Sequence, residues 1–513
     1  MIGGMDLSEG VALAVALNSS DLRCQAGHGA RSKTEWEGDA GYAGTVICWS
    51  DACMHLRHCP PLPGIQLFRL MLGMNYGARM ALIAVSFWGG LQAATVKDRE
   101  GAVRGDRAAM EHDARWIYND VDRGFAEAKR TGKPLLVVLR CVPCLSCVGL
   151  DAEVLKEPSL SPLLDQFVCV RVINANALDL RRFQFDYDLS FSTLIFNGDG
   201  TLYGRYGSWT HQADPDARET VGYRRALEAA LQLHRGYPKN RDSLVAKQGG
   251  PVTYSTPVEF PALAARYGRE LNWGGNVVQS CVHCHQVGEA FRAASRDRGE
   301  PVALEHIYPM PAPATIGLTL APDDIATVLA VAPSSYAAEA GVRQGDEFVT
   351  FNGQPLISIA DFAWVLHHAP DHGELPAAVK RAGTVIPLTV TLPPGWRTKS
   401  DISRRVGTWS MRAMALGGMS LVDLDNTERK ARGLAMRGMA LLAKGVGQYG
   451  KHAAAKKAGF QKDDVIVAID GVEDRTTEGE LIGQLLQTRK VGEWVTVTVL
   501  RGTERLEMKL PMQ

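Results

Sequence analysis

The 513-residue chain has no excess of charge of either sign, because it carries 56 basic and 56 acidic residues. A neutral balance provides no general attraction to nucleic acid or to an acidic membrane surface. No local basic patch stands out along the chain either. We therefore expect no nucleic-acid partner.

The sequence also lacks the short signatures of common proteolytic sites. It contains no GxSxG or GDSGG nucleophile segment and no HExxH segment. Such segments position a nucleophilic serine or a pair of zinc-binding histidines. The chain is therefore predicted to be neither a serine protease nor a zinc protease.

Long apolar runs are scarce, and the one in residues 71–94 is short. Arg79 precedes an apolar core over residues 80–91, and small residues follow it. This order is typical of a secretory signal, and the core is shorter than the roughly 20 residues that span a bilayer. We expect export, with residues 71–94 acting as a signal peptide or as an uncleaved membrane anchor, and the protein lying in the periplasm or facing it.

Residues 1–70 carry four cysteines but no periodic hydrophobicity. Since a signal peptide belongs at a chain start, we interpret this stretch as an upstream extension from a misassigned start codon and expect it to be disordered. The alternative is a zinc-binding extension, although its cysteines form no CxxC pair.

The length predicts three or four domains, at roughly 150 residues each. From about residue 106 the pattern alternates between helix and strand, and a hairpin and a closing helix end it. This order predicts an α/β domain. The expected elements are a helix over 114–131, strands over 135–139, 167–173, 193–197 and 201–206, and helices over 147–156 and 217–234.

Three cysteines follow the first of these strands directly: Cys141, Cys144 and Cys147. A thiol at the start of a helix is favoured as thiolate by the helix dipole and the unpaired backbone N–H groups. The run is therefore a candidate site of redox chemistry. A structural disulfide and a soft-metal site built from the three thiolates are the alternatives.

The segments KPLLVVLRCVPCLSC and STLIFNGDGTLYGRYG resemble the thioredoxin-like superfamily, over residues 106–238. The resemblance implies an active-site CxxC at Cys144 and Cys147, with Cys144 as the attacking thiolate and Cys147 as the resolving thiol. Two positions depart from the family. Ser192 stands where a cis-proline is usual, and Val138 replaces a buried acid, so a degenerate thioredoxin-like domain is the alternative.

A second cluster, Cys281-Val-His-Cys284-His285, has the CxxCH spacing of covalent c-type haem attachment. In such a site two thioethers hold the porphyrin and the adjacent histidine binds the iron. Met310, before a proline, is the candidate second axial ligand, and His306 is the other.

The surrounding segment, residues 241–313, is predicted to be a linker and is short for a cytochrome fold. The alternatives to haem are a disulfide between Cys281 and Cys284 or a metal site that uses His283 with His285. Apart from the possible haem c we expect no cofactor, and we assign no dedicated metal site.

One pattern occurs twice in the remaining chain, with AGVRQGDEFVTFNG in residues 314–395 and AGFQKDDVIVAIDG in residues 410–513. We call these the first repeat and the second repeat. Both resemble bacterial, circularly permuted PDZ domains. The resemblance implies that extended peptides add to an open sheet edge, where backbone N–H groups capture the terminal carboxylate.

In the first repeat the resemblance places the carboxylate loop at Gly317, Leu318, Thr319 and Leu320, and the side-chain pocket at Phe362 and Val365. In the second repeat residues 418–421 are the candidate loop. Closed grooves that serve as scaffolding are the alternative, above all in the second repeat.

The predicted fold class is multi-domain, α/β plus mainly-β: a thioredoxin-like α/β domain followed by two PDZ-like, partly open β-barrels. The predicted function is an exported thiol–disulfide redox or redox-sensing protein that recruits protein partners, through their C-termini, to its PDZ grooves. A non-enzymatic PDZ scaffold and a covalent-haem electron-transfer protein are the alternatives.

Overall fold

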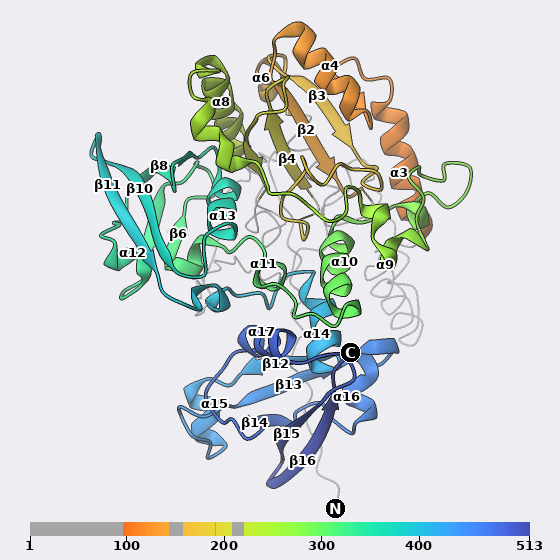
Figure 1. Cartoon of the computed structure of the whole chain (residues 1–513), viewed down its shortest axis with the longest axis vertical. Coiled ribbons are helices and arrows are strands. Elements are labelled where there is room, and N and C mark those ends of the chain that lie inside the picture. The colour runs from red at the N-terminus through yellow and green to blue at the C-terminus, as the bar shows by residue number, and fades with distance from the viewer. Residues whose placement is uncertain (1–95, 143–156, 190, 208–219) are drawn as a thin grey trace, which may run out of the picture. The chain divides into compact units, whose positions relative to one another are not determined.

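The computed structural model of the chain describes residues 96–142, 157–189, 191–207 and 220–513 (Figure 1). All of them belong to one compact unit, Ala93–Gln513. The predicted extension over 1–70, the signal segment over 71–94 and the helix over 147–156 lie outside the described residues. None of the helices in the described ranges is both long and apolar enough to span a bilayer.

The N-terminal part is an α/β domain around a five-stranded sheet with the order β1-β3-β2-β4-β5. β2 pairs in parallel with β3 and antiparallel with β4. All six residues of β2 are buried, as expected for a central strand covered on both faces. The strands are β1 (Trp116–Tyr118), β2 (Leu135–Arg140), β3 (Val168–Val172), β4 (Phe191–Phe196) and β5 (Leu202–Tyr206).

The prediction of a helix over 114–131 is wrong for its first part. Trp116–Tyr118 form β1, because they pair in parallel with β3, and helix α4 starts only after the N-cap Asp120, whose side chain accepts the N–H of Arg123. The other expected strands and the closing helix are present. The helices are α3 (Val96–Met110), α4 (Val121–Thr131), η3 (Pro158–Leu160), α6 (Ser161–Leu164), α8 (Val221–Gly236) and η4 (Arg241–Lys247).

The segment between the α/β domain and the first repeat forms helices around a small buried cluster, to which Leu180 of the α/β domain also belongs. Phe260, Tyr267 and Val287 belong to that cluster. Helix α10 follows the N-cap His283, whose backbone N–H donates to the side-chain oxygen of Gln286 at 2.8 Å. The elements are η5 (Pro257–Glu259), α9 (Pro261–Ala264), η6 (Val278–Ser280), α10 (Cys284–Asp297) and α11 (Leu304–Ile307).

The first repeat has two sheets, with the orders β6-β7 and β11-β10-β8-β9. Its strands are β6 (Leu318–Leu320), β7 (Val328–Val331), β8 (Glu347–Phe351), β9 (Gln354–Pro355), β10 (Gly373–Arg381) and β11 (Thr384–Leu392). Its helices are η7 (Pro313–Ile316), α12 (Tyr336–Glu339), α13 (Ile359–His367) and η8 (Trp396–Lys399).

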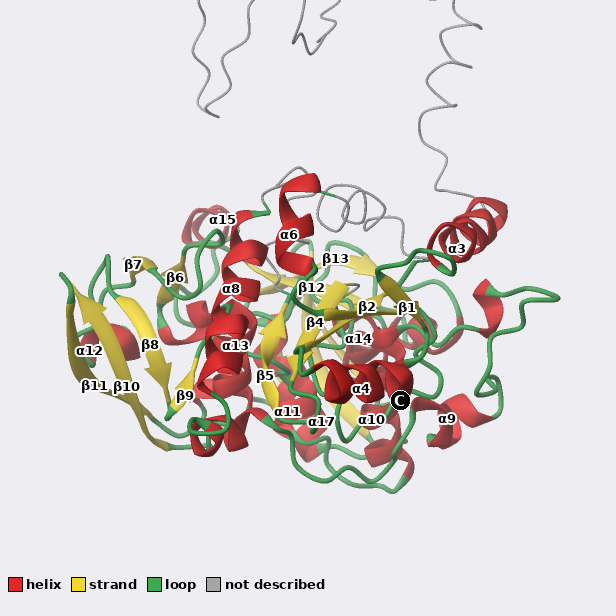
Figure 2. Ribbon diagram, turned by 90° about the horizontal axis from the view of Figure 1, so that it is seen from above, coloured by secondary structure: helices red, strands yellow, loops and turns green. Residues whose placement is uncertain are grey.

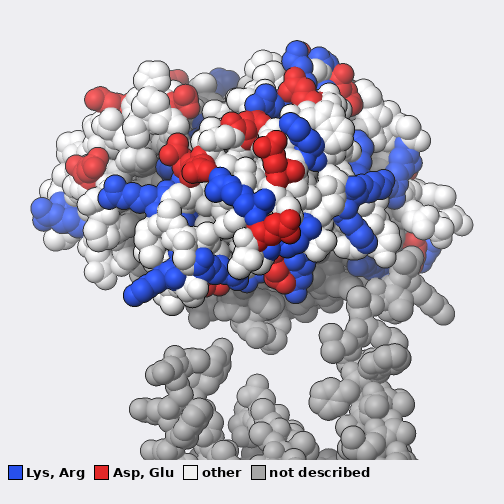
Figure 3. Space-filling view, turned by 90° about the horizontal axis from the view of Figure 1, so that it is seen from below, with Lys and Arg blue, Asp and Glu red and all other residues white. Residues whose placement is uncertain are grey.

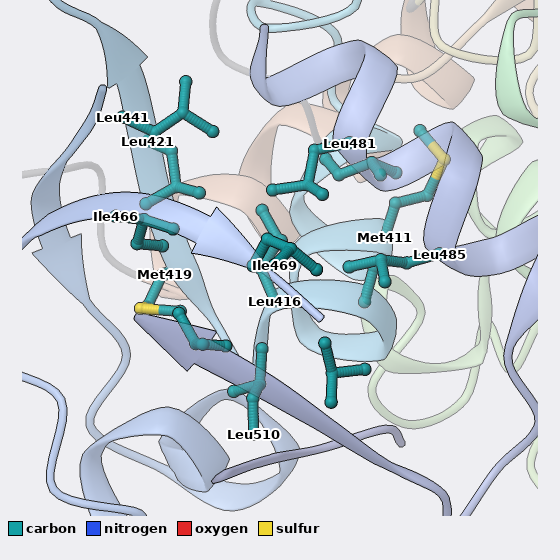
Figure 4. Close-up of a cluster of buried hydrophobic side chains, with 14 of the residues drawn as sticks. Met411, Leu416, Met419, Leu421, Leu441, Ile466, Ile469, Leu481, Leu485 and Leu510 are labelled. Carbon is teal, nitrogen blue, oxygen red and sulfur yellow. The ribbon is translucent and has the colours of Figure 1, made fainter. Parts of the chain in front are cut away.

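The second repeat has one antiparallel sheet, β12-β13-β14-β15-β16. Side chains of α14 and α17 meet those of the sheet in its core, as Met411, Leu481 and Ile469 show (Figure 4). The strands are β12 (Met419–Asp423), β13 (Leu441–Val446), β14 (Val465–Ile469), β15 (Trp494–Arg501) and β16 (Glu504–Pro511). The helices are α14 (Thr408–Leu416), α15 (Asn426–Ala431), η9 (Gly450–Ala453), α16 (Ala454–Lys457) and α17 (Glu478–Thr488).

Helix α13 of the first repeat lies against β5, the end strand of the α/β sheet (Figure 2). The side chain of Asp361 accepts a hydrogen bond from the backbone N–H of Arg205 at 3.0 Å, and the hydroxyl of Ser358 donates to the backbone carbonyl of Arg205. Gly204 permits the approach, because a Cβ there would overlap Asp361 and Ile357. Side chains of the first repeat thus cover the outer edge of β5, where no further strand of the described ranges pairs.

The predicted fold class is confirmed: an α/β domain is followed by two β-rich repeats. On the face drawn in Figure 3, Lys and Arg lie intermixed with Asp and Glu, as the equal numbers of the two charges suggest.

Candidate functional site

The candidate thiol site begins at the carboxyl end of β2, where Cys141 follows Arg140. The register pairs Leu139 with Ser192 and Arg140 with Phe191. Ser192 is buried, and its hydroxyl has no hydrogen-bond partner in the described part of the chain. The residue that replaces the family's proline therefore lies on the strand that faces the thiol site.

Cys144 and Cys147, the predicted attacking and resolving thiols, lie outside the described residues. The thiol of the run that the structure describes is that of Cys141, and it is buried. The assignment of Cys144 and Cys147 stays a prediction.

The second cysteine cluster lies beside the first. The Sγ of Cys141 and the Nδ1 of His283 are 3.0 Å apart, within hydrogen-bonding distance. Val142 and Cys281 belong to one buried cluster, and the Cys281 thiol donates to the carbonyl of Ile173 at 3.6 Å. Two motifs separated by about 140 residues thus form one site at the carboxyl ends of β2 and β3.

This contact was not predicted from the sequence, in which His283 stood out only as an alternative metal ligand. Spacing within each motif carries no information about a partner 142 residues away. Periodic patterns reveal which face of an element is buried, but they do not reveal which distant loop covers it.

Burial controls the ionisation of these groups. It raises the pKa of the Cys281 thiol to about 12, with a further increase from Cys284, and it raises the pKa of the Cys284 thiol to about 12. Burial also lowers the pKa of His283 to about 4, and nearby His285 and arginines add to this effect. At neutral pH these two thiols are protonated and the His283 imidazole is neutral, so its two nitrogens act as one donor and one acceptor.

The three residues that were predicted to attach haem pack against other parts of the protein. Cys281 and Cys284 are both buried, and Cys284 packs in the core of the α/β domain. The Nδ1 of His285 lies 3.0 Å from a carboxylate oxygen of Glu289. Haem attachment at this motif stays a prediction.

Met310 and His306, the candidate second axial ligands, line a cavity of about 360 Å³ beside α10 and α13. Aromatic side chains form part of its wall, among them Phe291 and Trp364. Within the described ranges no group of three or more His, Cys, Asp or Glu is arranged to hold a metal ion.

In the first repeat, β6 is the end strand of its sheet, and no strand of the described residues pairs with its outer edge. Ala332 donates to the carbonyl of Gly317, and Ala321 to that of Thr327, both at 2.8 Å. Because hydrogen-bonded and non-hydrogen-bonded positions alternate in an antiparallel pair, Leu318 and Leu320 direct their backbone N–H and C=O groups outward. This geometry suits the addition of an extended peptide.

The predicted peptide-binding residues of the first repeat lie in the following environments. Gly317 has φ 86° at the end of η7, a conformation that glycine adopts without strain. Thr319 is exposed. Leu318, Leu320, Phe362 and Val365 belong to the buried core of the repeat. Their role in peptide binding stays a prediction.

In the second repeat the corresponding edge strand, β12, has a partner on its outer side. The backbone N–H of Leu421 donates to Oε1 of Glu478 at 2.7 Å. Arg412 donates to both carboxylate oxygens of Glu478, at 2.8 and 2.6 Å. A side chain of α17 thus takes the place that a peptide carbonyl would occupy, which the sequence did not reveal.

Comparison with known families identifies the three folded parts. Residues 116–198 match the thioredoxin-like family, and residues 327–381 and 433–512 match PDZ domains. The protein therefore contains a thioredoxin-like domain and two PDZ domains, which are the first and second repeats.

A curated relative is the periplasmic pH-dependent serine endoprotease DegQ of Escherichia coli (strain K12), 27% identical over 181 residues. The match covers 35% of this chain and 35% of DegQ, so the chain spans about a third of the length of that relative. Among solved structures, the HtrA-type protease AlgW with a decapeptide matches 27% of this chain and 48% of its own, at 17% identity and a TM-score of 0.18.

Proposed function

We propose that this protein is an exported thiol–disulfide redox or redox-sensing protein that recruits protein partners through its first PDZ domain. The observation that carries the proposal is the contact between Cys141 and His283, with Sγ and Nδ1 3.0 Å apart. It joins both cysteine clusters at the end of β2, where members of the thioredoxin-like family carry their reactive thiols. Export rests on the signal-like residues 71–94.

In the proposed exchange the Cys144 thiolate attacks one sulfur of a partner disulfide. The partner S–S bond breaks, and its other sulfur leaves as a thiolate and takes up a proton. Cys147 loses its proton and attacks the Cys144 sulfur, which releases the second partner thiol and leaves a Cys144–Cys147 disulfide. Two electrons pass to the partner, and an external thiol reductant returns them to the protein.

The first repeat supplies the recruitment step. The outward backbone groups of Leu318 and Leu320 on β6 are available to an extended peptide, and an N–H group captures its terminal carboxylate in this binding mode. A partner held at this groove is present near the thiol site at a raised effective concentration.

The thiol function is tested by disulfide reduction of insulin with the full chain and its variants. Cys144→Ser should abolish reduction, and Cys147→Ser should accumulate mixed disulfides with partners. The matched control is Cys169→Ser, because Cys169 is a buried thiol that pairs with Leu136 near the other end of β2. Unchanged reduction by Cys144→Ser would exclude Cys144 as the attacking thiol. No reduction by the unmodified protein would leave the non-enzymatic PDZ scaffold as the function.

The recruitment function is tested with a library of peptides that display free C-termini. Peptides selected by the full chain should lose binding when their terminal carboxylate is amidated. Equal binding of the acid and the amide would exclude C-terminal capture.

A further inference from the structure

A segment of the chain packs against β12 and α17 of the second repeat. We call residues 393–407, which join β11 to α14, the connector. Ile402 of the connector is 1% exposed and packs in the core of the second repeat, with Leu421 of β12 and Leu481 of α17. The resemblance to PDZ domains implies that a bound peptide lies between these two elements, which is where Ile402 packs.

A glycine in α17 allows the connector to pack closely against this helix. Gly479, its second residue, has no side chain, and a Cβ there would lie 3.2 Å from Cγ1 of Ile402 and 3.7 Å from the carbonyl oxygen of Ser400. Connector residues 398–403 line one cleft together with residues 421–423 of β12 and 477–480 of α17. The connector thus faces both walls of the groove.

A buried ion pair closes the polar side of the groove. Glu478 accepts the N–H of Leu421 and hydrogen bonds from Nε and Nη2 of Arg412, and Nη2 also donates to the carbonyl of Ser403 at 3.0 Å. The side chains of Arg412 and Glu478 are 15% and 4% exposed. One network therefore joins the edge strand, the helix and the connector, and the outward amide of Leu421 is already bonded.

The first repeat differs at the corresponding position. Each helix follows a hydroxyl N-cap, Ser358 in α13 and Thr477 in α17, and the next residue is Ile359 in one and Glu478 in the other. Isoleucine has no acceptor, so it leaves the outward amide of Leu320 without this internal ligand. The two repeats thus differ at one equivalent position, where only the glutamate of the second repeat can accept a backbone N–H of the edge strand.

We propose that the connector is the ligand of the second PDZ domain. Its groove is closed by Ile402 and by the Arg412–Glu478 pair, and it accepts an external peptide only when the connector leaves. Peptide capture by the resting protein therefore takes place at the first repeat. This inference is independent of the thiol chemistry.

The test uses the full chain and a fluorescent peptide with the sequence of residues 398–408, followed by fluorescence anisotropy. The unmodified protein should not bind the peptide, because its groove is filled. Ile402→Asp should release the connector and allow binding, whereas the same peptide carrying aspartate at the Ile402 position should not bind. Val406→Asp is the matched control, since Val406 lies on the connector but is 45% exposed.

Two outcomes would overturn the proposal: binding of the peptide by the unmodified protein, or no binding by Ile402→Asp. If Ile402→Asp does not fold, amide hydrogen exchange in the unmodified protein and in Glu478→Ala replaces it. The Leu421 amide should be protected in the former and exchange at least about tenfold faster in the latter. Exchange of that amide at the same rate in both proteins contradicts closure of the groove by the Arg412–Glu478 pair.

Discussion

Lys247 and Asp361 form a buried ion pair, with Nζ and Oδ2 2.6 Å apart and side chains 0% and 1% exposed. Lys247 ends η4 after the α/β domain, and Asp361 lies in α13 of the first repeat. Burial lowers the pKa of Lys247, and the charge of Asp361 opposes this shift. The carboxylate of Asp361 therefore favours the charged form of Lys247 at a contact from which water is excluded.

Asp361→Ala should destabilise the protein by about 3–5 kcal/mol, because it leaves the Lys247 charge buried without a partner. Urea unfolding at pH 7 measures the loss. Glu347→Ala is the control, since Glu347 pairs with Lys380 at the surface, at 3.3 Å, and such exposed pairs contribute less than about 1 kcal/mol. Equal losses in the two variants would show that the buried pair has no special role.

Ile359→Glu should close the groove of the first repeat. By analogy with Glu478, the new carboxylate would accept the outward amide of Leu320 and compete with a peptide carbonyl. The affinity for a selected C-terminal peptide should fall at least about tenfold, measured by calorimetry, while Ile359→Val should bind as the unmodified protein does. Full affinity in Ile359→Glu would contradict peptide addition at β6.

We expect Asp346 to make a pH-dependent contribution to the stability of the first repeat. Hydrogen bonds from Arg381 lower its pKa below the usual value, and burial opposes this effect. Because the folded pKa lies below the unfolded one, the contribution is present above about pH 4 and is lost as the pH falls further.

Asp346→Asn should therefore cost about 1–3 kcal/mol at pH 7 and should flatten the decline in unfolding free energy below pH 4. Urea unfolding at several pH values measures both effects. Asp371→Asn is the control, because Asp371 is exposed. A decline that is equally steep in Asp346→Asn would assign the acid sensitivity to other groups.

Haem attachment at the CxxCH motif predicts a Soret band that stays with the denatured chain, when the protein is purified from a host that matures c-type cytochromes. Cys284→Ala should weaken the covalent link, and Cys169→Ala should not change it. Absence of the band in the denatured protein would leave Cys281 and Cys284 as packing thiols.

Much of the fold was predictable because its signals are local. The apolar strand before Cys141 and the repeated AG…NG and AG…DG segments depend on residues that are neighbours in the chain, and the structure contains the elements they predict. Trp116–Tyr118 were predicted as helix, because nothing in their own sequence reveals the pairing with β3. The state of such a short segment is decided by its partner strand.

The sequence by itself determined the three folded domains, the candidate thiols and the two repeats, because turn residues and hydrophobic periodicity act over a few residues. Only the tertiary structure decided that His283 lies beside Cys141 and that Glu478 bonds Leu421, residues separated by 142 and 57 positions. Such contacts depend on how folded elements pack against one another. The two repeats share one sequence pattern, but Glu478 bonds the outer edge of β12 in the second, whereas no strand of the described residues pairs with the outer edge of β6 in the first.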